Sequence, residues 1–416
     1  MLALLALAAA AAVEPPRAWV ERPCPAAVGP NVICSEMRDE AGALVLAARP
    51  RNANGILIVH AHGGPRLDPP AAGDNDEDLD RFAAFVRAGY GWVGSSYRRG
   101  GYGVRMAAAD VDRSRALYWA SFGRPRLTIL HGQSWGGNVA ARLAESGALD
   151  VENRALYDGV LLTAGVLSGG SQAYQFRADL RAVYQYYCRN HPAADEAAYP
   201  VWQGLPLGAR LTRAQLRQRV NDCTGAELPA AARTPAQAQR LRDIVAVTGV
   251  AESQLVPHLA FATFTFRDLV MVRLSGRNPF DNSTRRYSGS ADDAALNAGV
   301  PRFAADPQGR ALLSFDADLT GRIVLPTITL HSRADQTVSP DASRRYAEMV
   351  AGAGNAPLLL SLFAARGTHS RLSDAEYTAA IEALTRWVET GAKPSPAQVI
   401  ERCTRIATPE QPCSID

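Results

Sequence analysis

The chain has 416 residues, of which 47% are hydrophobic and 20% are charged. This composition is that of a globular protein able to bury a sizeable core, and it excludes a chain that is disordered throughout. The formal net charge is only +3, and the basic residues are spread along the sequence instead of clustering. Because phosphate backbones attract clustered Lys and Arg, we expect no nucleic-acid partner.

The sequence begins with an apolar, alanine-rich run over residues 1–13. The run is too short to cross a bilayer but has the length of the hydrophobic part of a secretory signal peptide. No Lys or Arg precedes it, so only the α-amino group supplies positive charge there. We expect a cleaved signal peptide, a periplasmic or secreted protein and no stable membrane span. The alternative is a buried N-terminal segment.

Six cysteines fall into three pairs that are close in sequence: Cys24 with Cys34, Cys188 with Cys223, and Cys403 with Cys413. Six cysteines allow fifteen connectivities, so this local pairing is a hypothesis. No pair has the C-x-x-C spacing of zinc or redox centres. Three disulfides would agree with export.

Short apolar runs predict the first part of a sheet. Residues 20–50 suggest two or three antiparallel strands, including 43–48, separated by turn residues. Apolar runs separated by helix-length stretches follow at 56–60, 91–94, 127–130 and 160–162, and again at 328–330 and 358–360. Such alternation is typical of βαβ units and a parallel sheet.

Helix signals replace this pattern in the middle of the chain, where capping boxes pair Thr212 with Gln215 and Thr234 with Gln237. We therefore expect a first core segment at 17–167, a helical cap or lid insertion at 168–322, and a second core segment at 323–416. A third capping box, Ser373 with Glu376, starts a helix that ends at Gly391 in that second segment. The insertion's aromatic side chains either line a pocket or form plain core: Tyr174, Phe176, Tyr184, Tyr186, Tyr187 and Trp202.

The strongest local signal is the pattern G-x-S-x-G at residues 132–136, which follows the apolar run 127–130 and precedes a helical stretch. A sharp turn from strand to helix needs small residues at Gly132 and Gly136, and it exposes the hydroxyl of Ser134. The helix N-terminus favours developing negative charge. We therefore expect Ser134 to be a nucleophile.

A serine nucleophile needs donors for the oxyanion that forms during its attack. The sequence His62-Gly-Gly-Pro65 follows the strand at 56–60, where glycines let the main chain approach a substrate closely. We expect the amide of Gly63 or Gly64 and the amide of Trp135 to form an oxyanion hole. The alternative for the glycines is a turn without a functional role.

The acid and the base should follow later strands, in the chain order serine, acid, histidine. Asp335 lies just beyond the run 328–330, and His369 lies between the run 358–360 and the capped helix. Asp316 and Asp318 are rival acids, but both precede the later strands. The remaining histidines are expected to be structural or pocket-lining, or to lie in the insertion: His60, His62, His131, His331, His191 and His258.

These motifs, in this order, resemble the α/β-hydrolase superfamily over residues 17–167 and 323–392. The resemblance implies an α/β fold with a mostly parallel central sheet flanked by helices. The loop at 89–103 is similar to a loop of prolyl-oligopeptidase-type peptidases, and 132–136 with 62–65 is similar to proline iminopeptidases. The chain has no room for a propeller domain, and Arg66 stands where iminopeptidases usually carry a further Gly. Similarity to tannase-type esterases is weaker, because Gln133 replaces a cysteine of that group.

Together the residues predict a serine hydrolase that cleaves carboxylic esters without a cofactor. A small-molecule ester or a short peptide is the expected partner, and no feature indicates an oligomeric state. The first alternative is a peptidase, for which Asp179, Asp281 and Asp292 are candidate partners of a substrate amine. The second is a catalytically silent binding protein on the same scaffold.

Overall fold

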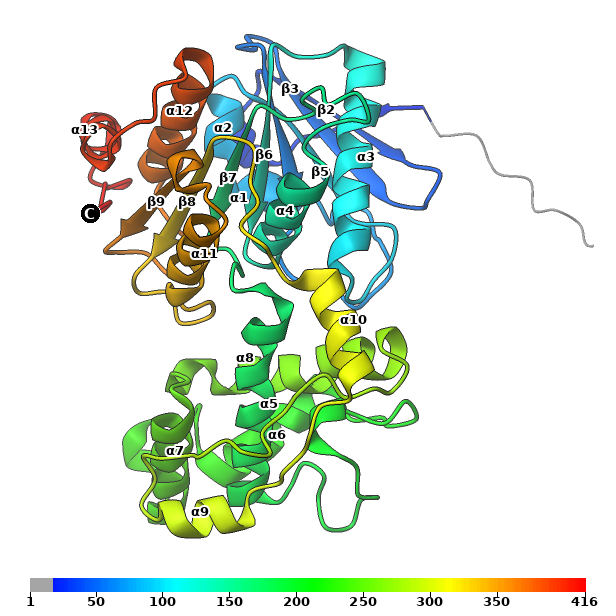
Figure 1. Cartoon of the computed structure of the whole chain (residues 1–416), viewed down its shortest axis with the longest axis vertical. Coiled ribbons are helices and arrows are strands. Elements are labelled where there is room, and N and C mark those ends of the chain that lie inside the picture. Colours follow the sequence, from blue (N-terminus) through cyan, green and yellow to red (C-terminus); the bar gives the residue numbers. More distant parts are fainter. Residues whose placement is uncertain (1–17) are drawn as a thin grey trace, which may run out of the picture.

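The computed structural model describes residues 18–416. The expected signal peptide at 1–13 lies outside the described residues. Figure 1 shows two parts: a sheet with helices on both sides, and a wholly helical part below it.

A single nine-stranded sheet has the order β1-β2-β3-β5-β4-β6-β7-β8-β9. Strands β1, β2, β3 and β5 pair antiparallel, and all pairs from β5 through β4 to β9 are parallel. The expected antiparallel start and parallel continuation are both present. The bounds are β1 Val20–Arg22, β2 Val32–Arg38, β3 Leu44–Pro50, β4 Ile56–Ala61, β5 Gly91–Ser95, β6 Leu127–Gln133, β7 Gly159–Thr163, β8 Thr327–Ser332 and β9 Leu359–Ala364.

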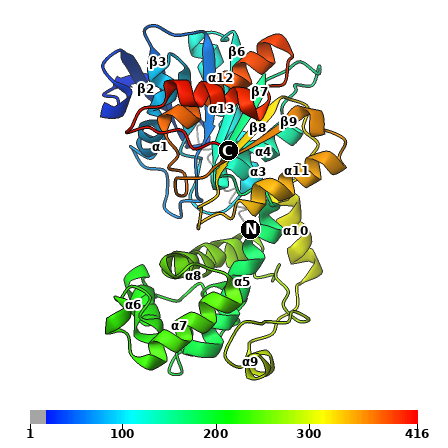
Figure 2. The same cartoon turned by 90° about the vertical axis from the view of Figure 1, so that its left-hand side faces the viewer.

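Helices cover both faces of the sheet (Figures 1 and 2). One face carries α3 (Val104–Phe122), α4 (Trp135–Ser146) and α11 (Asp341–Gly352). The other carries α1 (Asp76–Arg81), α2 (Ala83–Arg87) and α12 (Asp374–Thr390), with α13 (Pro396–Ile406) packed on α12. Short 3-10 helices occur at Ala26–Val28, Val201–Gln203, Ala230–Ala232, Glu252–Gln254 and Ala356–Leu358.

Strand β4 illustrates why the central strands read as continuous apolar runs. Leu57 and Val59 point into the core on the α3 and α4 side, whereas Ile56 and Ile58 point into the core on the α2 and α12 side. Side chains alternate across a strand, so a strand covered on both faces is apolar along most of its length, and in β4 only His60 is polar. This architecture and strand order confirm the expected α/β-hydrolase fold.

The helical part lies between β7 and β8 in the sequence, and we call it the insertion. Both expected capping boxes are present: Thr212 caps α6 and Thr234 caps α7. Its helices are α5 Gly169–Cys188, α6 Arg213–Thr224, α7 Pro235–Thr248, α8 Leu255–Ala260, α9 Asp293–Gly299 and α10 Pro307–Ala317, and π-helical segments at Phe261–Thr265 and Arg267–Arg273 follow α8.

Helix α10 fastens the insertion to the core. The Asp316 carboxylate accepts hydrogen bonds from the amides of Val104 and Arg105 at the start of α3, at 2.9 and 3.1 Å. The Asp318 carboxylate accepts one from the amide of Ser171 at 2.8 Å. Asp316 and Asp318, the rival catalytic acids, therefore accept hydrogen bonds from the first turns of α3 and α5.

Three disulfides join Cys24 to Cys34, Cys188 to Cys223, and Cys403 to Cys413. This is the local pairing expected from the sequence. The second disulfide links the end of α5 to α6 within the insertion, and the third ties the C-terminal tail to α13. Disulfides of this kind persist in oxidising compartments.

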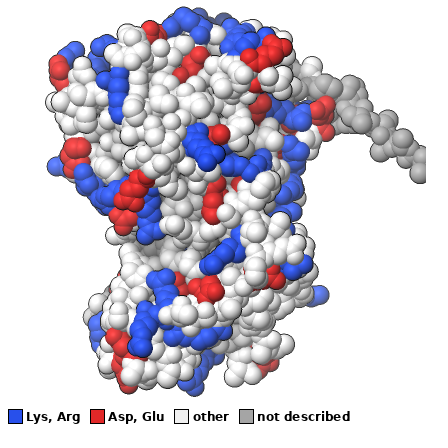
Figure 3. Space-filling model, in the orientation of Figure 1, with Lys and Arg blue, Asp and Glu red and all other residues white. Residues whose placement is uncertain are grey.

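One helical run among residues 18–416, Glu252–Arg273, is long and apolar enough to cross a membrane by length and composition. In this fold 56% of its apolar window is buried inside the protein. The core helix of a globular protein has the same properties. On the face seen in Figure 3, acidic and basic side chains are interspersed.

Candidate active site

Ser134 stands at the sharp turn between β6 and α4, as the G-x-S-x-G pattern predicts. Its backbone is strained, with φ 57° and ψ −124°. A Cβ atom at Gly132 would collide with the carbonyl oxygen of Gly136, and one at Gly136 would collide with the carbonyl oxygen of Ala61. Only glycine fits at both positions, because β4, β6 and α4 approach so closely there.

The structure brings Ser134, His369 and Asp335 together. His369 Nε2 lies 2.8 Å from Ser134 Oγ, and His369 Nδ1 lies 2.7 Å from Asp335 Oδ2. These residues are separated by 201 and 34 positions in the sequence. They meet because β6, β8 and β9 are parallel, so the loops after their carboxyl ends share one edge of the sheet.

The Asp335 carboxylate is buried, with no exposed side-chain surface. Its Oδ1 accepts hydrogen bonds from the amides of Thr337 and Val338, both at 2.9 Å, and His331 Nε2 lies 3.2 Å from Oδ2. Burial acts to raise the pKa of Asp335, but hydrogen bonds from His331 and His369 outweigh it and hold this pKa below its usual value. Asp335 is therefore ionised at neutral pH and fixed in position.

The loop after β4 carries Gly63 and Gly64, the latter with φ 74°. The amides of Gly63, Gly64 and Trp135 donate no hydrogen bond to any acceptor within residues 18–416. Buried side chains fasten the preceding residue, His62: its Nδ1 contacts Asp78 Oδ2, and Tyr97 donates from its hydroxyl to the His62 carbonyl at 2.9 Å. The loop is thus held rigidly while its own donors stay free.

Asp78, on α1, belongs to a buried network that the sequence did not reveal. Besides His62 it faces His60, whose Nε2 lies 3.4 Å away, and His60 in turn contacts His131. Burial acts to raise the pKa of Asp78, but the two neighbouring histidines lower it further than burial raises it. His60, His62 and His131, which we expected to be structural or pocket-lining, all lie in this network.

A second link joins the serine turn directly to the histidine loop. Gln133 Nε2 donates a hydrogen bond to Ser370 Oγ, and both side chains are buried. Gln133 also packs against Gly63, where any Cβ atom would collide with its side-chain oxygen. The side chain next to Ser134 in the sequence therefore contacts both the neighbour of His369 and the candidate oxyanion loop.

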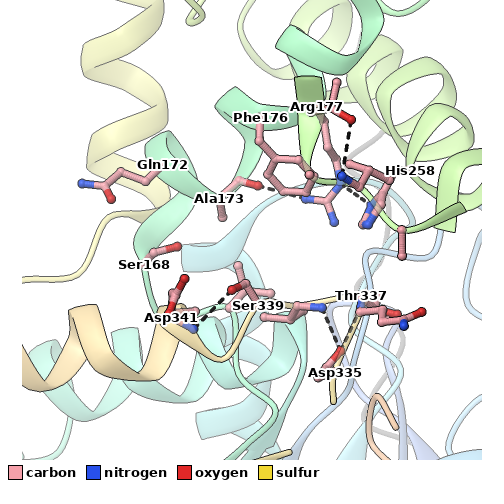
Figure 4. A pocket seen from close by; sticks show the side chains of 18 of the residues that line it. Ser168, Gln172, Ala173, Phe176, Arg177, His258, Asp335, Thr337, Ser339 and Asp341 are labelled. Carbon is pink, nitrogen blue, oxygen red and sulfur yellow. Dashed lines mark hydrogen bonds between the residues drawn. The ribbon is translucent and has the colours of Figure 1, made fainter. Parts of the chain in front are cut away.

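A cavity of about 570 Å³ lies beside Asp335, between the insertion and the core. Figure 4 shows Phe176, Arg177 and His258 on its insertion side, facing the segment from Asp335 to Asp341. Arg177 Nε donates to His258 Nδ1 at 3.2 Å, and burial, reinforced by Arg177, lowers the pKa of His258 to about 3. His258 is therefore neutral at physiological pH.

Of the insertion aromatics considered above, Phe176 lines this cavity. Tyr174 and Tyr184 are fully buried core residues. Tyr186, Tyr187 and Trp202 are partly buried against the core. Within residues 18–416, no three His, Cys, Asp or Glu side chains are grouped closely enough to hold a metal ion.

The sequence matches no protein-family model and no curated protein. Its fold is similar to that of an esterase from Aspergillus oryzae, at 14% identity and a TM-score of 0.42, covering 91% of this chain and 87% of that one. An esterase from Pyrococcus furiosus has 12% identity and a TM-score of 0.41, covering 91% and 96%. Feruloyl esterase B from Aspergillus oryzae has 15% identity and a TM-score of 0.38, covering 91% and 88%. The assignment of the fold rests on the strand order described above.

Proposed function

We propose that this protein is an exported serine hydrolase that cleaves carboxylic esters with Ser134 as nucleophile, His369 as base and Asp335 as orienting acid. The observation that carries the proposal is the continuous chain of hydrogen bonds from Ser134 Oγ through both nitrogens of His369 to Asp335, at 2.8 and 2.7 Å. A hydroxyl is a weak nucleophile until a base takes its proton, and this geometry is suited to that transfer.

The reaction begins when Ser134 Oγ attacks the ester carbonyl carbon while His369 Nε2 takes the hydroxyl proton. The amides of Trp135 and of Gly63 or Gly64 stabilise the resulting oxyanion. The carbon–oxygen bond to the alcohol then breaks, and His369 returns the proton to the leaving alcohol. Water next attacks the acyl-enzyme, His369 takes its proton, and the carboxylic acid leaves as Ser134 regains a proton. The ionised Asp335 holds the imidazole and stabilises its cationic form.

The charges beside the site favour an ester over an amine-bearing peptide. Asp179 is bound to Tyr287 and Arg285, Asp281 binds the amides of Ser283 and Ala305, and Asp292 caps α9. None of these three carboxylates lines the cavity beside Asp335. The cavity is lined by the buried cation of Arg177, which would repel a substrate amine, and its buried carboxylate, Asp335, is already hydrogen-bonded to His369 and His331.

The test compares short acyl esters with aminoacyl amides, using the wild type and Ser134→Ala. We expect wild-type turnover of esters that Ser134→Ala abolishes. Cleavage of amides alone would replace the esterase by the peptidase alternative. Folded protein without Ser134-dependent turnover of any of these substrates would favour the silent binding protein.

Export and the role of the insertion are part of the proposal. The apolar run at 1–13 and three disulfides support a periplasmic or secreted location. We infer domain segments at 17–167, 168–322 and 323–416, with the middle one acting as a cap that shapes the substrate cavity. Intact-mass measurement of secreted material would test processing: retention of residues 1–13 would contradict cleavage.

A further inference from the structure

Arg177 is a buried cation that has no anionic partner in the described part of the chain. It lies on α5, is 6% exposed, and forms no ion pair with any carboxylate among residues 18–416. Burial lowers the pKa of Arg177, but only to about 10, so the guanidinium is charged at neutral pH. A buried charge that lacks a counter-ion is costly. Arg181 on the same helix is also buried, but only Arg177 lines the cavity, where a ligand could supply the missing negative charge.

The surrounding side chains fix this guanidinium in place. Its Nε donates to His258, and its Nη1 donates to the Ala173 carbonyl at 2.9 Å. The aromatic rings of Phe176 and Phe261 lie 4.5 and 4.3 Å from its central carbon. Its remaining nitrogen, Nη2, has no acceptor among the described residues, although the side chain lines the cavity (Figure 4). The group is preorganised with one donor nitrogen unused.

The other charged groups lining the cavity do not neutralise Arg177. Asp335 is already bonded to two histidines and two amides and exposes no side-chain surface. Asp341 pairs with Arg344, and Arg345 adds a second cation that contacts Gln172. The cavity therefore offers positive charge to a ligand while its acids are occupied.

We propose that Arg177 binds a carboxylate of the substrate, so that the preferred substrate is an ester carrying a free carboxylate beyond its scissile bond. The inference rests on the proposed function and names the substrate class of that same site, which the cavity adjoins through Asp335; Ser134 and His369 are not among the residues that line the cavity. Guanidinium and carboxylate are matched in shape and charge, and a hydrogen bond to a charged group is stronger than a neutral one. The apolar wall formed by Phe176, Val166 and Val338 would contact the carbon chain between the two groups.

The carboxylate can belong to the acyl part or to the alcohol part, and two substrate pairs distinguish them. The first pair is the 4-nitrophenyl monoester of glutaric acid and the corresponding ester of glutaric acid monoamide. The second is the acetate ester of 4-hydroxybenzoate and that of 4-hydroxybenzamide. We expect kcat/KM to favour the charged member about 10- to 100-fold in at least one pair. Ratios near one in both pairs would overturn the inference.

Variants on α5 then assign the preference to Arg177. Arg177→Met should reduce the charged-to-neutral ratio at least tenfold, and Arg177→Lys should retain part of it. Arg181→Met is the matched control: Arg181 is also buried on α5 and pairs with no carboxylate of residues 18–416, but it does not line the cavity. Its ratio should stay within about twofold of the wild type. An unchanged ratio in folded Arg177→Met would contradict the proposal.

A binding measurement keeps the inference testable without turnover. Calorimetry on Ser134→Ala should show glutarate binding at least tenfold more tightly than glutaramide. Equal or undetectable binding of both would overturn the carboxylate site even if esters are hydrolysed. Tighter glutarate binding by a wild type that hydrolyses no ester would support the site and contradict the proposed function, so the two failures are distinguishable.

Discussion

The sheet and the insertion contribute different groups to the candidate site. The sheet places Ser134, Asp335 and His369 just beyond the carboxyl ends of β6, β8 and β9, where short hydrogen bonds join the three side chains to one another. The insertion contributes the opposite wall of the cavity, where a fixed cation and aromatic rings face the core. On our proposal, chemistry belongs to the sheet and substrate choice to the insertion, so the two should be separable by mutation.

The largest effect should follow loss of the nucleophile. Ser134→Ala should lower kcat about 10⁶-fold, because the other members of the triad cannot act without the hydroxyl. Initial rates with an activated ester measure this loss, and circular dichroism checks the fold. Ser146→Ala, at the exposed end of the same helix α4, is the control and should keep its turnover. Comparable loss in both variants would mean that the sheet does not provide the chemistry in the way proposed.

Loss of the orienting acid should be the next largest effect. Asp335→Asn should lower kcat about 10⁴-fold, because the imidazole would be held in the wrong tautomer. Asp316→Asn provides the comparison, since Asp316 joins α10 to α3 and has no contact with His369. Its melting temperature should fall while its kcat changes less than tenfold. A large loss of kcat in Asp316→Asn with little loss in Asp335→Asn would instead identify Asp316, in the insertion, as the orienting acid.

Removal of disulfides compares the stability of the two regions. Cys188 and Cys223 close a loop of 35 residues in the insertion, whereas Cys24 and Cys34 close one of 10 beside the sheet. On the chain-entropy model, replacing both cysteines by serine should cost about 4 kcal/mol in the insertion and about 3 kcal/mol beside the sheet. Denaturant titration measures both losses. As the denaturant concentration rises, the variant without the Cys188–Cys223 disulfide should lose its preference for carboxylate-bearing esters before it loses turnover of neutral esters. The opposite order would contradict the proposed separation of chemistry from substrate choice.

Acid should weaken the folded state through buried neutral histidines. Burial lowers the pKa of His131 in the sheet region and of His191 and His258 in the insertion. The unfolded chain therefore binds more protons than the folded chain below pH of about 6.5, and stability falls as pH falls through that value. Each histidine contributes a slope of up to about 1.4 kcal/mol per pH unit.

Urea titrations at pH 7.0, 6.0 and 5.0 measure this dependence. His191→Gln removes one buried neutral histidine from the insertion. The free energy of unfolding of this variant should therefore change less steeply with pH, by up to about 1.4 kcal/mol per pH unit. A steeper slope in the variant, or stability that rises towards pH 5, would show that the buried histidines gain protons in the folded state instead.

The sequence predicts which residues meet where their positions depend on strand ends, and it misses contacts that depend on how helices pack. The loops after β6, β8 and β9 meet because parallel strands place their carboxyl ends at one edge, so Ser134, Asp335 and His369 could be selected from their positions alone. The contact of Arg177 with His258 spans 81 positions and depends on how α5 packs against α8. No periodicity or motif marks it.

The supports of the site were equally invisible in the sequence. Asp78 sits on a short helix, 16 positions beyond His62, and only the fold brings its carboxylate beneath the loop after β4. The link between Gln133 and Ser370 spans 237 positions. In the sequence Gln133 stands out only because it replaces a cysteine of tannase-type esterases, and that substitution does not indicate a contact with the histidine loop.

Covalent labelling with a fluorophosphonate, followed by peptide mapping, tests the central claim most directly, because the reagent requires an activated serine beside oxyanion donors. We predict one phosphonyl group per chain, attached to Ser134, and labelling that is slowed by orders of magnitude in His369→Ala. Folded wild-type protein that stays unlabelled, or that carries the label on another residue, would contradict the account.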